Sequence, residues 1–154
     1  METLMTKNLD KPELDAFICF SLYAASHAFN RLYQPLLEPL GLTYPQYLVM
    51  SVLWAGDGKL VGEIGARLGL VSSTLTPLLK RLENSGLVAR SRDREDERQV
   101  RVTLTPEGRT LRAQAATVPG CVLTATGMTT DELGDLRAKI DTLRVAIEGA
   151  VANR

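Results

Sequence analysis

The chain has 154 residues, of which 45% are hydrophobic and 23% charged, a composition typical of one compact globular domain spanning residues 1–154. Its uncharged stretches are interrupted before they supply the roughly 18 consecutive apolar residues that cross a bilayer, and no basic segment opens an apolar leader, so we expect neither a membrane span nor a secretory signal. Two cysteines and one histidine are too few for a disulfide framework or a zinc site, so we expect a cytoplasmic protein with no metal or other cofactor.

The net charge is zero but is unevenly distributed. Residues 1–58 carry 3 basic and 6 acidic side chains, residues 59–112 carry 11 and 7, and residues 113–154 carry 4 and 5. The middle segment therefore has a net charge of +4. This excess favours an anionic partner that faces the middle of the chain.

The first predicted element is a long helix. Apolar residues recur every three or four positions from Pro12 to about Glu38, as on one face of a helix. Pro12 fits its first turn, and Pro35, Pro39 and Gly41 are expected to bend and end it. A second helix is expected after residues 43–45, Thr-Tyr-Pro, where Thr43 or Tyr44 caps, and to end at the Gly-Asp-Gly sequence 56–58.

Two short helices follow, over residues 61–69 and from Ser72 to residue 86. Gly69 ends the first, and the hydroxyls of Ser72, Ser73 and Thr74 are expected to cap the second, so the pair predicts a helix-turn-helix. After residue 86 the period changes to two, and residues 87–92 and 99–104 predict antiparallel strands around a polar tip at 93–98. This hairpin is a wing.

Two more helices complete the chain. One is expected from Thr105-Pro106-Glu107 toward a break at Pro119-Gly120, and the last runs from Thr130 to Val151. The winged helix-turn-helix of about residues 45–105 has its own small core, so the apolar stripes of the flanking helices, about 12–40 and 106–152, need another partner. A two-fold homodimer that interlocks these helices is the simplest solution, and helices folding back in a monomer are the alternative.

A winged helix-turn-helix rich in basic residues points to double-stranded DNA, whose major groove admits a helix and whose phosphates attract cations. A protein-interaction module is the alternative. We expect Asp93 or Asp96 to brace the wing by pairing with Arg98. The residues expected to contact DNA are Ser72, Ser73, Thr74, Thr76, Lys80 and Arg81 on the second helix and Arg92, Arg94 and Arg98 on the wing.

Cys19 has two interpretations, a small buried hydrophobic residue or a reactive thiol. If the helix begins at Pro12, Cys19 lies beyond the strongest part of the helix dipole, so a thiolate there needs other hydrogen-bond donors, such as tyrosine hydroxyls. Tyr33 lies 14 residues further along the same helix, about 21 Å away. It therefore reaches Cys19 only across an antiparallel dimer.

Three segments of the sequence resemble the MarR family of winged-helix repressors: residues 42–50 (LTYPQYLVM), residues 74–83 (TLTPLLKRLE) and the wing tip 93–98 (DREDER). Cys19-Phe20 followed by Leu22-Tyr23 resembles the OhrR-type branch, which senses organic hydroperoxides. The resemblance covers about residues 12–110. It implies a mainly α fold with a small β-wing and a homodimer that represses by binding a pseudo-palindromic DNA operator.

The resemblance also implies a redox switch. In that branch an organic hydroperoxide oxidises the cysteine matching Cys19 to a sulfenic acid, and tyrosines matching Tyr33 and Tyr44 come from the opposite subunit. A second cysteine of the other subunit resolves the sulfenic acid in two-cysteine members, a role for which Cys121 is the candidate; a merely structural Cys121 is the alternative. We expect the hydroperoxide to enter an apolar pocket lined by Phe17, Phe20 and Met50. A repressor released by a small phenolic ligand, with Cys19 inert, and a thiol peroxidase are the competing functions.

Overall fold

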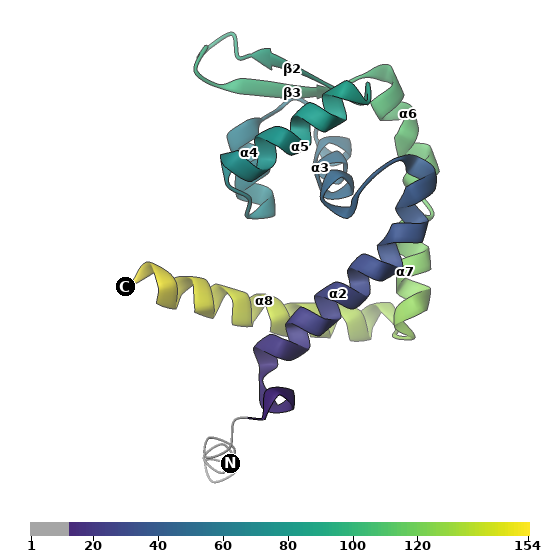
Figure 1. Cartoon of the computed structure of the whole chain (residues 1–154), viewed down its shortest axis with the longest axis vertical. Helices are drawn as coiled ribbons and strands as arrows, with labels where there is room; N and C mark the ends of the chain where they lie inside the picture. The colour runs from purple at the N-terminus through teal and green to yellow at the C-terminus, as the bar shows by residue number, and fades with distance from the viewer. Residues whose placement is uncertain (1–12) are drawn as a thin grey trace. The chain divides into compact units, whose positions relative to one another are not determined.

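The computed structural model describes residues 13–154. Figure 1 shows their helices and strands, coloured from purple near the N-terminus to yellow at the C-terminus. The chain divides into two compact units, the first ending at Ala115 and the second running from Ala116 to Arg154. Within residues 13–154 no helix combines the length and the apolar character that crossing a membrane requires.

The first unit opens with a 3-10 turn, η1 (Leu14–Ala16), then the long helix α2 (Ile18–Leu37) and a second turn, η2 (Glu38–Leu40). The prediction that this helix starts at Pro12 is wrong: Pro12 lies outside the described residues, and α2 begins at Ile18 because the extended backbone of Phe17 (φ −86°, ψ 119°) separates it from η1. Pro35 lies inside α2 without ending it. The end comes at Gly41, whose φ of 67° is left-handed.

The rest of the first unit holds a small sheet among four helices, α3 (Tyr44–Ala55), α4 (Val61–Leu68), α5 (Ser72–Asn84) and α6 (Pro106–Ala115). Thr43 caps α3 as predicted: its hydroxyl accepts from the Gln46 amide at 3.4 Å, and the Gln46 side chain accepts from the Thr43 amide at 2.9 Å. We call residues 44–115, from the start of α3 to the end of α6, the winged unit.

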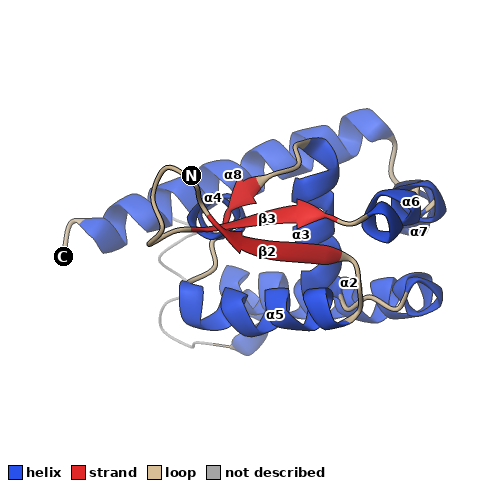
Figure 2. Ribbon diagram, turned by 90° about the horizontal axis from the view of Figure 1, so that it is seen from above, coloured by secondary structure: helices blue, strands red, loops and turns tan. Residues whose placement is uncertain are grey.

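The two predicted wing strands are present as β2 (Val88–Arg92) and β3 (Val100–Leu104), paired antiparallel with Val88 opposite Leu104 and Arg92 opposite Val100. A third strand, β1 (Lys59–Leu60), pairs with β3 on its other side, so that β3 is central (Figure 2). Strand β1 has no signal in the sequence, because two residues are too few for a periodic pattern.

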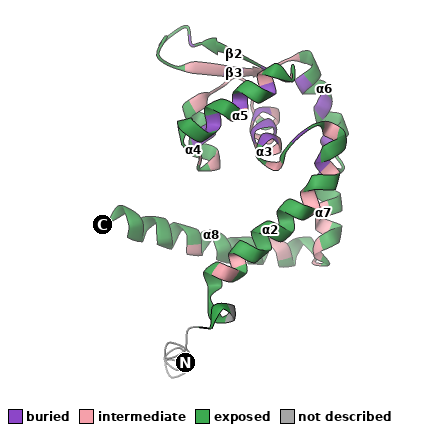
Figure 3. Ribbon diagram, in the orientation of Figure 1, coloured by how far each residue is buried: buried purple, intermediate pink, exposed green. Residues whose placement is uncertain are grey.

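The core of the winged unit lies between the sheet and its helices. Its apolar side chains come from α3, α4, α5 and α6, whose buried segments are visible in Figure 3, and from β2 and β3. The members that are at most 2% exposed are Val49, Met50, Leu53, Ile64, Leu75, Leu79, Leu82, Val88 and Val102. This core fixes α5 by one face and leaves its opposite face in solvent.

The second unit contains α7 (Val118–Thr126) and α8 (Thr130–Ala152), joined through Gly127 at a left-handed φ of 65°. The predicted break at Pro119-Gly120 falls earlier, between Ala115 and Val118, because a proline in the first turn of a helix forfeits no hydrogen bond and Pro119 opens α7. Helix α8 buries none of its residues within the described chain (Figure 3).

Candidate nucleic-acid interface and thiol site

Helices α4 and α5 form a helix-turn-helix whose turn depends on glycine. Gly69 ends α4 at a φ of 67°, and the amide of Leu70 donates to the carbonyl of Gly65 at 2.9 Å. A Cβ atom added to Gly65 would lie 2.8 Å from the carbonyl oxygen of Leu70, a separation that side chains do not adopt. The close approach of the turn to α4 therefore sets the angle at which α5 leaves it.

The second helix of the pair, α5, presents one buried and one exposed face. Leu75, Leu79 and Leu82 are fully buried. The prediction that the hydroxyls of residues 72–74 cap α5 is wrong: the cap residue is Val71, without a side-chain bond, and these hydroxyls stand in the first turn. The side chains that α5 exposes include Ser72, Ser73, Thr74, Thr76, Lys80 and Arg81. This face combines hydrogen-bonding groups at the N-terminal end with cations further along.

Arg101 holds the base of the wing. Its guanidinium donates to Oδ1 of Asp93 through Nε at 3.1 Å and Nη2 at 2.9 Å, and Nη1 donates to the carbonyl of Gly58. Asp93 is only 9% exposed, and its amide donates to Gln99. Of the two carboxylates expected to pair with Arg98, Asp93 pairs instead with Arg101 of β3, whereas Asp96 does pair with Arg98 and confirms that alternative.

Of the two arginines in the tip at residues 93–98, Arg94 has no acidic partner among the described residues. Arg98 pairs with Asp96, its Nε lying 3.1 Å from Oδ1, although the Arg98 side chain stays 90% exposed. Arg92 donates from Nη1 to the backbone carbonyl of Glu97 at 2.8 Å. Arg94 is exposed and forms no ion pair within residues 13–154. Arg94 is thus the tip residue with a guanidinium available to an outside anion.

A third ion pair ties the wing to α5. The Glu83 carboxylate accepts from the backbone amide of Arg90 at 3.0 Å and from its guanidinium at 3.1 Å. These bonds hold the pKa of the Glu83 carboxyl below its usual range. Because Glu83 lies on α5 and Arg90 on β2, the helix and the wing are held in one fixed arrangement.

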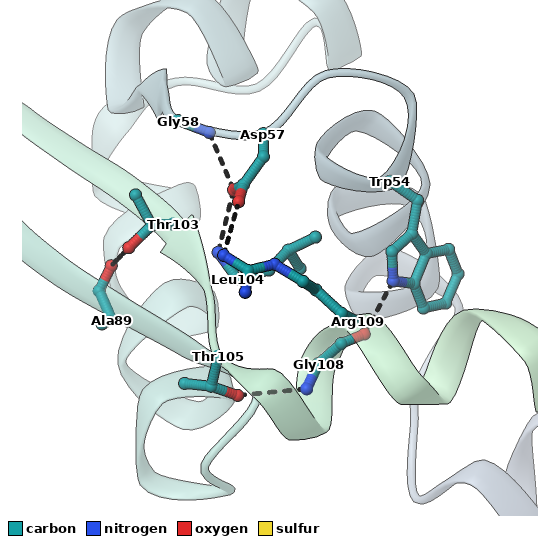
Figure 4. A network of polar contacts seen from close by, with 9 residues as sticks. All are labelled: Trp54, Asp57, Gly58, Ala89, Thr103, Leu104, Thr105, Gly108 and Arg109. Atoms are coloured by element: carbon teal, nitrogen blue, oxygen red, sulfur yellow. Dashed lines mark hydrogen bonds and ion pairs between the residues drawn. The ribbon is translucent and has the colours of Figure 1, made fainter.

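A further polar network joins α3, the sheet and α6 (Figure 4). Oδ1 of Asp57 accepts from the amides of Gly58 and Leu104, both at 2.8 Å, and its other oxygen lies 3.6 Å from Nη2 of Arg109. The indole N–H of Trp54 donates to the carbonyl of Gly108 at 2.8 Å. The network fixes the start of α6, through which the chain passes to the second unit.

Cys19 is the second residue of α2, is exposed and is unpaired. The prediction that it lies beyond the strong part of the helix dipole is therefore wrong. The first-turn amides of a helix lack intrahelical acceptors, and the positive end of the dipole lies there. Cys19 and Tyr33 share one unbroken helix and lie about 21 Å apart along it, so they do not touch within one chain.

Tyr33 and Tyr44 form a phenol pair. Their ring centroids are 4.6 Å apart, and Tyr47 stacks beside Tyr33 at 5.8 Å. Burial, with smaller contributions from Tyr44 and Tyr47, raises the pKa of Tyr33 to about 12, and burial also raises the pKa of Tyr44. Both phenols therefore keep their protons at neutral pH and remain hydrogen-bond donors.

The remaining predicted site residues are dispersed. Cys121 is exposed on α7 and belongs to the second unit, whereas Cys19 belongs to the first. Of the predicted pocket residues, Phe17 is 42% exposed, Phe20 is half-buried and Met50 is fully buried. Met50 is therefore part of the core and lines no open pocket of this unit, because α3 turns that face inward.

Sequence reasoning missed Arg101, Asp57 and the Glu83–Arg90 pair. Charge alternation on β3 could have flagged Arg101, but nothing in the sequence indicates which carboxylate it meets. Asp57 reads as a turn residue in Gly56-Asp57-Gly58, and its bonds to Leu104 and Arg109 come from segments about 50 positions away.

Comparisons with known proteins agree with this geometry. A family model described as "Transcriptional regulator SarA/Rot" matches residues 31–114. The HTH-type transcriptional regulator TtmR of Methylorubrum extorquens is 55% identical over 87% of this chain and 67% of its own length. The organic hydroperoxide resistance transcriptional regulator of Bacillus subtilis is 40% identical over 90% of this chain and 95% of its own.

The solved structure of reduced AbfR bound to DNA covers 98% of this chain and 99% of its own, with a TM-score of 0.78 and 30% identity. AbfR in its disulfide form matches with a TM-score of 0.63, and overoxidized AbfR bound to DNA with 0.70. TtmR and the Bacillus subtilis protein are both named as transcriptional regulators. The chain therefore belongs to the SarA/Rot family of transcriptional regulators, winged-helix proteins of the MarR and OhrR type.

Proposed function

We propose that the protein is a homodimeric repressor that binds a pseudo-palindromic DNA operator and releases it when an organic hydroperoxide oxidises Cys19. The observation that carries the proposal is the position of Cys19, whose thiol is exposed near the start of α2 and lies about 21 Å along that helix from Tyr33 of its own chain. The thiolate, not the thiol, is the nucleophile that attacks peroxide oxygen.

The exposed face of α5 enters the major groove. Hydroxyls of Ser72, Ser73 and Thr74 lie at its N-terminal end, the part of a recognition helix that contacts base edges. Lys80 and Arg81 lie further along and contact phosphates, and Thr76 lies between the two groups. On the wing, Arg94 extends toward the adjacent minor groove, while Arg92 and Arg98 contact the backbone.

Two copies of the chain complete the molecule. Helix α8 exposes an apolar stripe at helical spacing, and the start of α2 exposes another. Exposed apolar surface of this extent on long helices is typical of an interface. The exposed members are Leu14, Phe17, Ile18 and Phe29 in the N-terminal region and Leu136, Ile140, Ile147 and Val151 on α8. In an antiparallel arrangement Tyr33 and Tyr44 of the partner donate hydrogen bonds to the Cys19 thiolate.

The sensing step is a two-electron oxidation of sulfur. The Cys19 thiolate attacks the terminal oxygen of ROOH, the O–O bond breaks, and the leaving alkoxide takes up a proton to become the alcohol ROH. Cys19 is left as a sulfenic acid. The thiolate of Cys121 from the partner then attacks this sulfur, an S–S bond forms, and hydroxide leaves and is protonated to water. The disulfide form of AbfR supports such an end state in a relative.

Release follows from geometry. A dimer engages two half-sites about one helical turn of DNA, or a multiple, apart, so its recognition helices must keep one spacing. Oxidation removes the hydrogen bonds from the phenols to the thiolate, and the disulfide pulls on α7 in the second unit. A small rotation of each winged unit then misplaces α5 against one half-site.

Anisotropy of a labelled duplex, selected from random sequence by the reduced protein, tests the proposal. Cumene hydroperoxide is expected to release the wild type, whereas Cys19→Ser is expected to bind with unchanged affinity and stay bound. On non-reducing electrophoresis a dimer-sized band is expected only when both cysteines are present, so Cys121→Ser serves as the matched control. Peroxide-driven release of the Cys19→Ser protein would contradict the thiol mechanism.

A further inference from the structure

The structure describes every residue of the winged unit. Val71 is the one large hydrophobic residue of this unit whose side chain is exposed to solvent. It is 66% exposed. Every other leucine, isoleucine, valine, methionine, tyrosine or tryptophan between residues 44 and 115 is buried or half-buried. Outside this unit, exposed large hydrophobic residues lie in the N-terminal segment, on α2 and on α8. Val71 is therefore the exception in a unit whose other large hydrophobic side chains are buried or half-buried.

Val71 also occupies a position at which valine is unfavourable. It is the N-cap of α5, with an extended backbone (φ −77°, ψ 155°) and a carbonyl that accepts from the amides of Thr74 and Leu75. Its side chain makes no capping bond. Serine, threonine, aspartate or asparagine is strongly preferred here, because the side-chain oxygen of these residues satisfies a free amide of the first turn. Valine forgoes that stabilisation and also leaves its methyl groups in water.

A residue that breaks two local rules without a gain to the fold marks a functional position. The three residues that follow Val71 in the chain, Ser72, Ser73 and Thr74, are exposed and polar. This surrounding disfavours a protein partner, whose interface would bury a contiguous apolar core. A lone apolar group among hydroxyls at the N-terminal end of a recognition helix matches the edge of a thymine, which presents one methyl group beside hydrogen-bonding atoms.

We propose that Val71 reads the C5-methyl group of a thymine in the major groove, and that this contact helps to specify one base pair in each half-site of the operator. The inference rests on the proposed binding of DNA by α5. It assigns selectivity to an apolar contact, beside the hydroxyls of the first turn that contact neighbouring base edges and phosphates. The Val71 methyl groups leave water on binding, and the thymine methyl group does the same.

Deoxyuridine provides a probe that removes only this methyl group. In a duplex selected from random sequence by the reduced full-length protein, each thymine is replaced in turn by deoxyuridine, and the dissociation constant is measured by anisotropy. For the wild type, one replacement per half-site is expected to weaken binding about fourfold, the factor expected for one methyl group taken out of water. For Val71→Ala, which lacks the two γ-methyl groups, the same replacement is expected to have a smaller effect.

Two further variants separate recognition from folding. Val71→Ser supplies the missing cap, so its melting temperature is expected to rise while its response to deoxyuridine disappears. Val145→Ala removes an equally simple side chain that is 59% exposed on α8, and it is expected to keep the wild-type response. A deoxyuridine effect of the same size in wild type, Val71→Ala and Val71→Ser would overturn the proposal, as would the lack of any effect in the wild type. Both results leave DNA binding itself intact, whereas a failure of the wild type to select any duplex would refute the proposed function as well.

Discussion

Replacing Gly108 by alanine is expected to destabilise the winged unit, although alanine is the better helix former. A Cβ at this position of α6 would lie 2.1 Å from the carbonyl oxygen of Leu87 and 3.3 Å from Cδ2 of Leu104. The first contact is with backbone, so the helix itself must move by more than about 1 Å to restore the 3.4–4 Å of an ordinary van der Waals contact. That movement also stretches the bond from Trp54 to the Gly108 carbonyl.

Three contributions change the unfolding free energy of the Gly108→Ala variant. Overpacking of this kind costs about 1–3 kcal/mol, the lost indole bond about 1 kcal/mol, and the gain in helix propensity returns about 1 kcal/mol. The net destabilisation is therefore about 1–3 kcal/mol. Urea unfolding monitored by the fluorescence of Trp54, the single tryptophan, measures this loss at the network itself.

Gly62→Ala is the matched control, because Gly62 also lies in a helix of the winged unit but has nothing within 4 Å of an added Cβ. It is expected to leave stability unchanged or to raise it by about 0.5–1 kcal/mol. Equal unfolding free energies for the two variants, at equal denaturant slopes, would refute the close approach of α6 to Leu87.

Three further predictions concern caps and titrating groups. Thr43→Ala is expected to lower the unfolding free energy by about 0.5–2 kcal/mol through loss of the cap of α3, and a urea midpoint unchanged from wild type would count against that cap. The stabilisation associated with the raised pKa of Tyr33 is present below pH 10 and is lost as the pH rises through about 12. Tyr33→Phe is expected to remove the ionisation step at the highest pH in an absorbance titration at 295 nm. An unchanged titration would disprove the raised pKa of Tyr33. The lowered pKa of Glu83 stabilises the fold above about pH 4.5, and this contribution is lost as the pH falls through the folded-state pKa. In Glu83→Gln the unfolding free energy is therefore expected to fall less steeply with decreasing pH than in wild type. An equally steep fall in the two proteins would exclude the bonds from Arg90.

Elements with strong local signals could be predicted from the sequence. The wing strands alternate in polarity, α5 has a leucine stripe, and Thr43-Tyr44-Pro45 carries a cap followed by proline, so each is specified by residues close together in the chain. The exposed face of α5 followed directly from its buried one.

Features that depend on distant residues could not be predicted. The start of α2 at Ile18 is set by the extended Phe17 and not by a proline or a polar cap, so helical periodicity alone placed it too early. Asp93 meets Arg101 rather than Arg98 because strand pairing brings them together. The fully buried Met50 shows the same limit, since an apolar residue on a helix suits a core as well as a pocket.

The ion pairs of the wing also affect the affinity expected of the proposed repressor for DNA that lacks its operator. Glu83, Asp93 and Asp96 each engage an arginine of the same chain. Affinity for any duplex grows with the number of phosphates that a protein neutralises, and arginines held internally contribute less to that number. If the protein binds DNA as proposed, duplexes that offer phosphates without the right base edges are therefore expected to retain it only briefly.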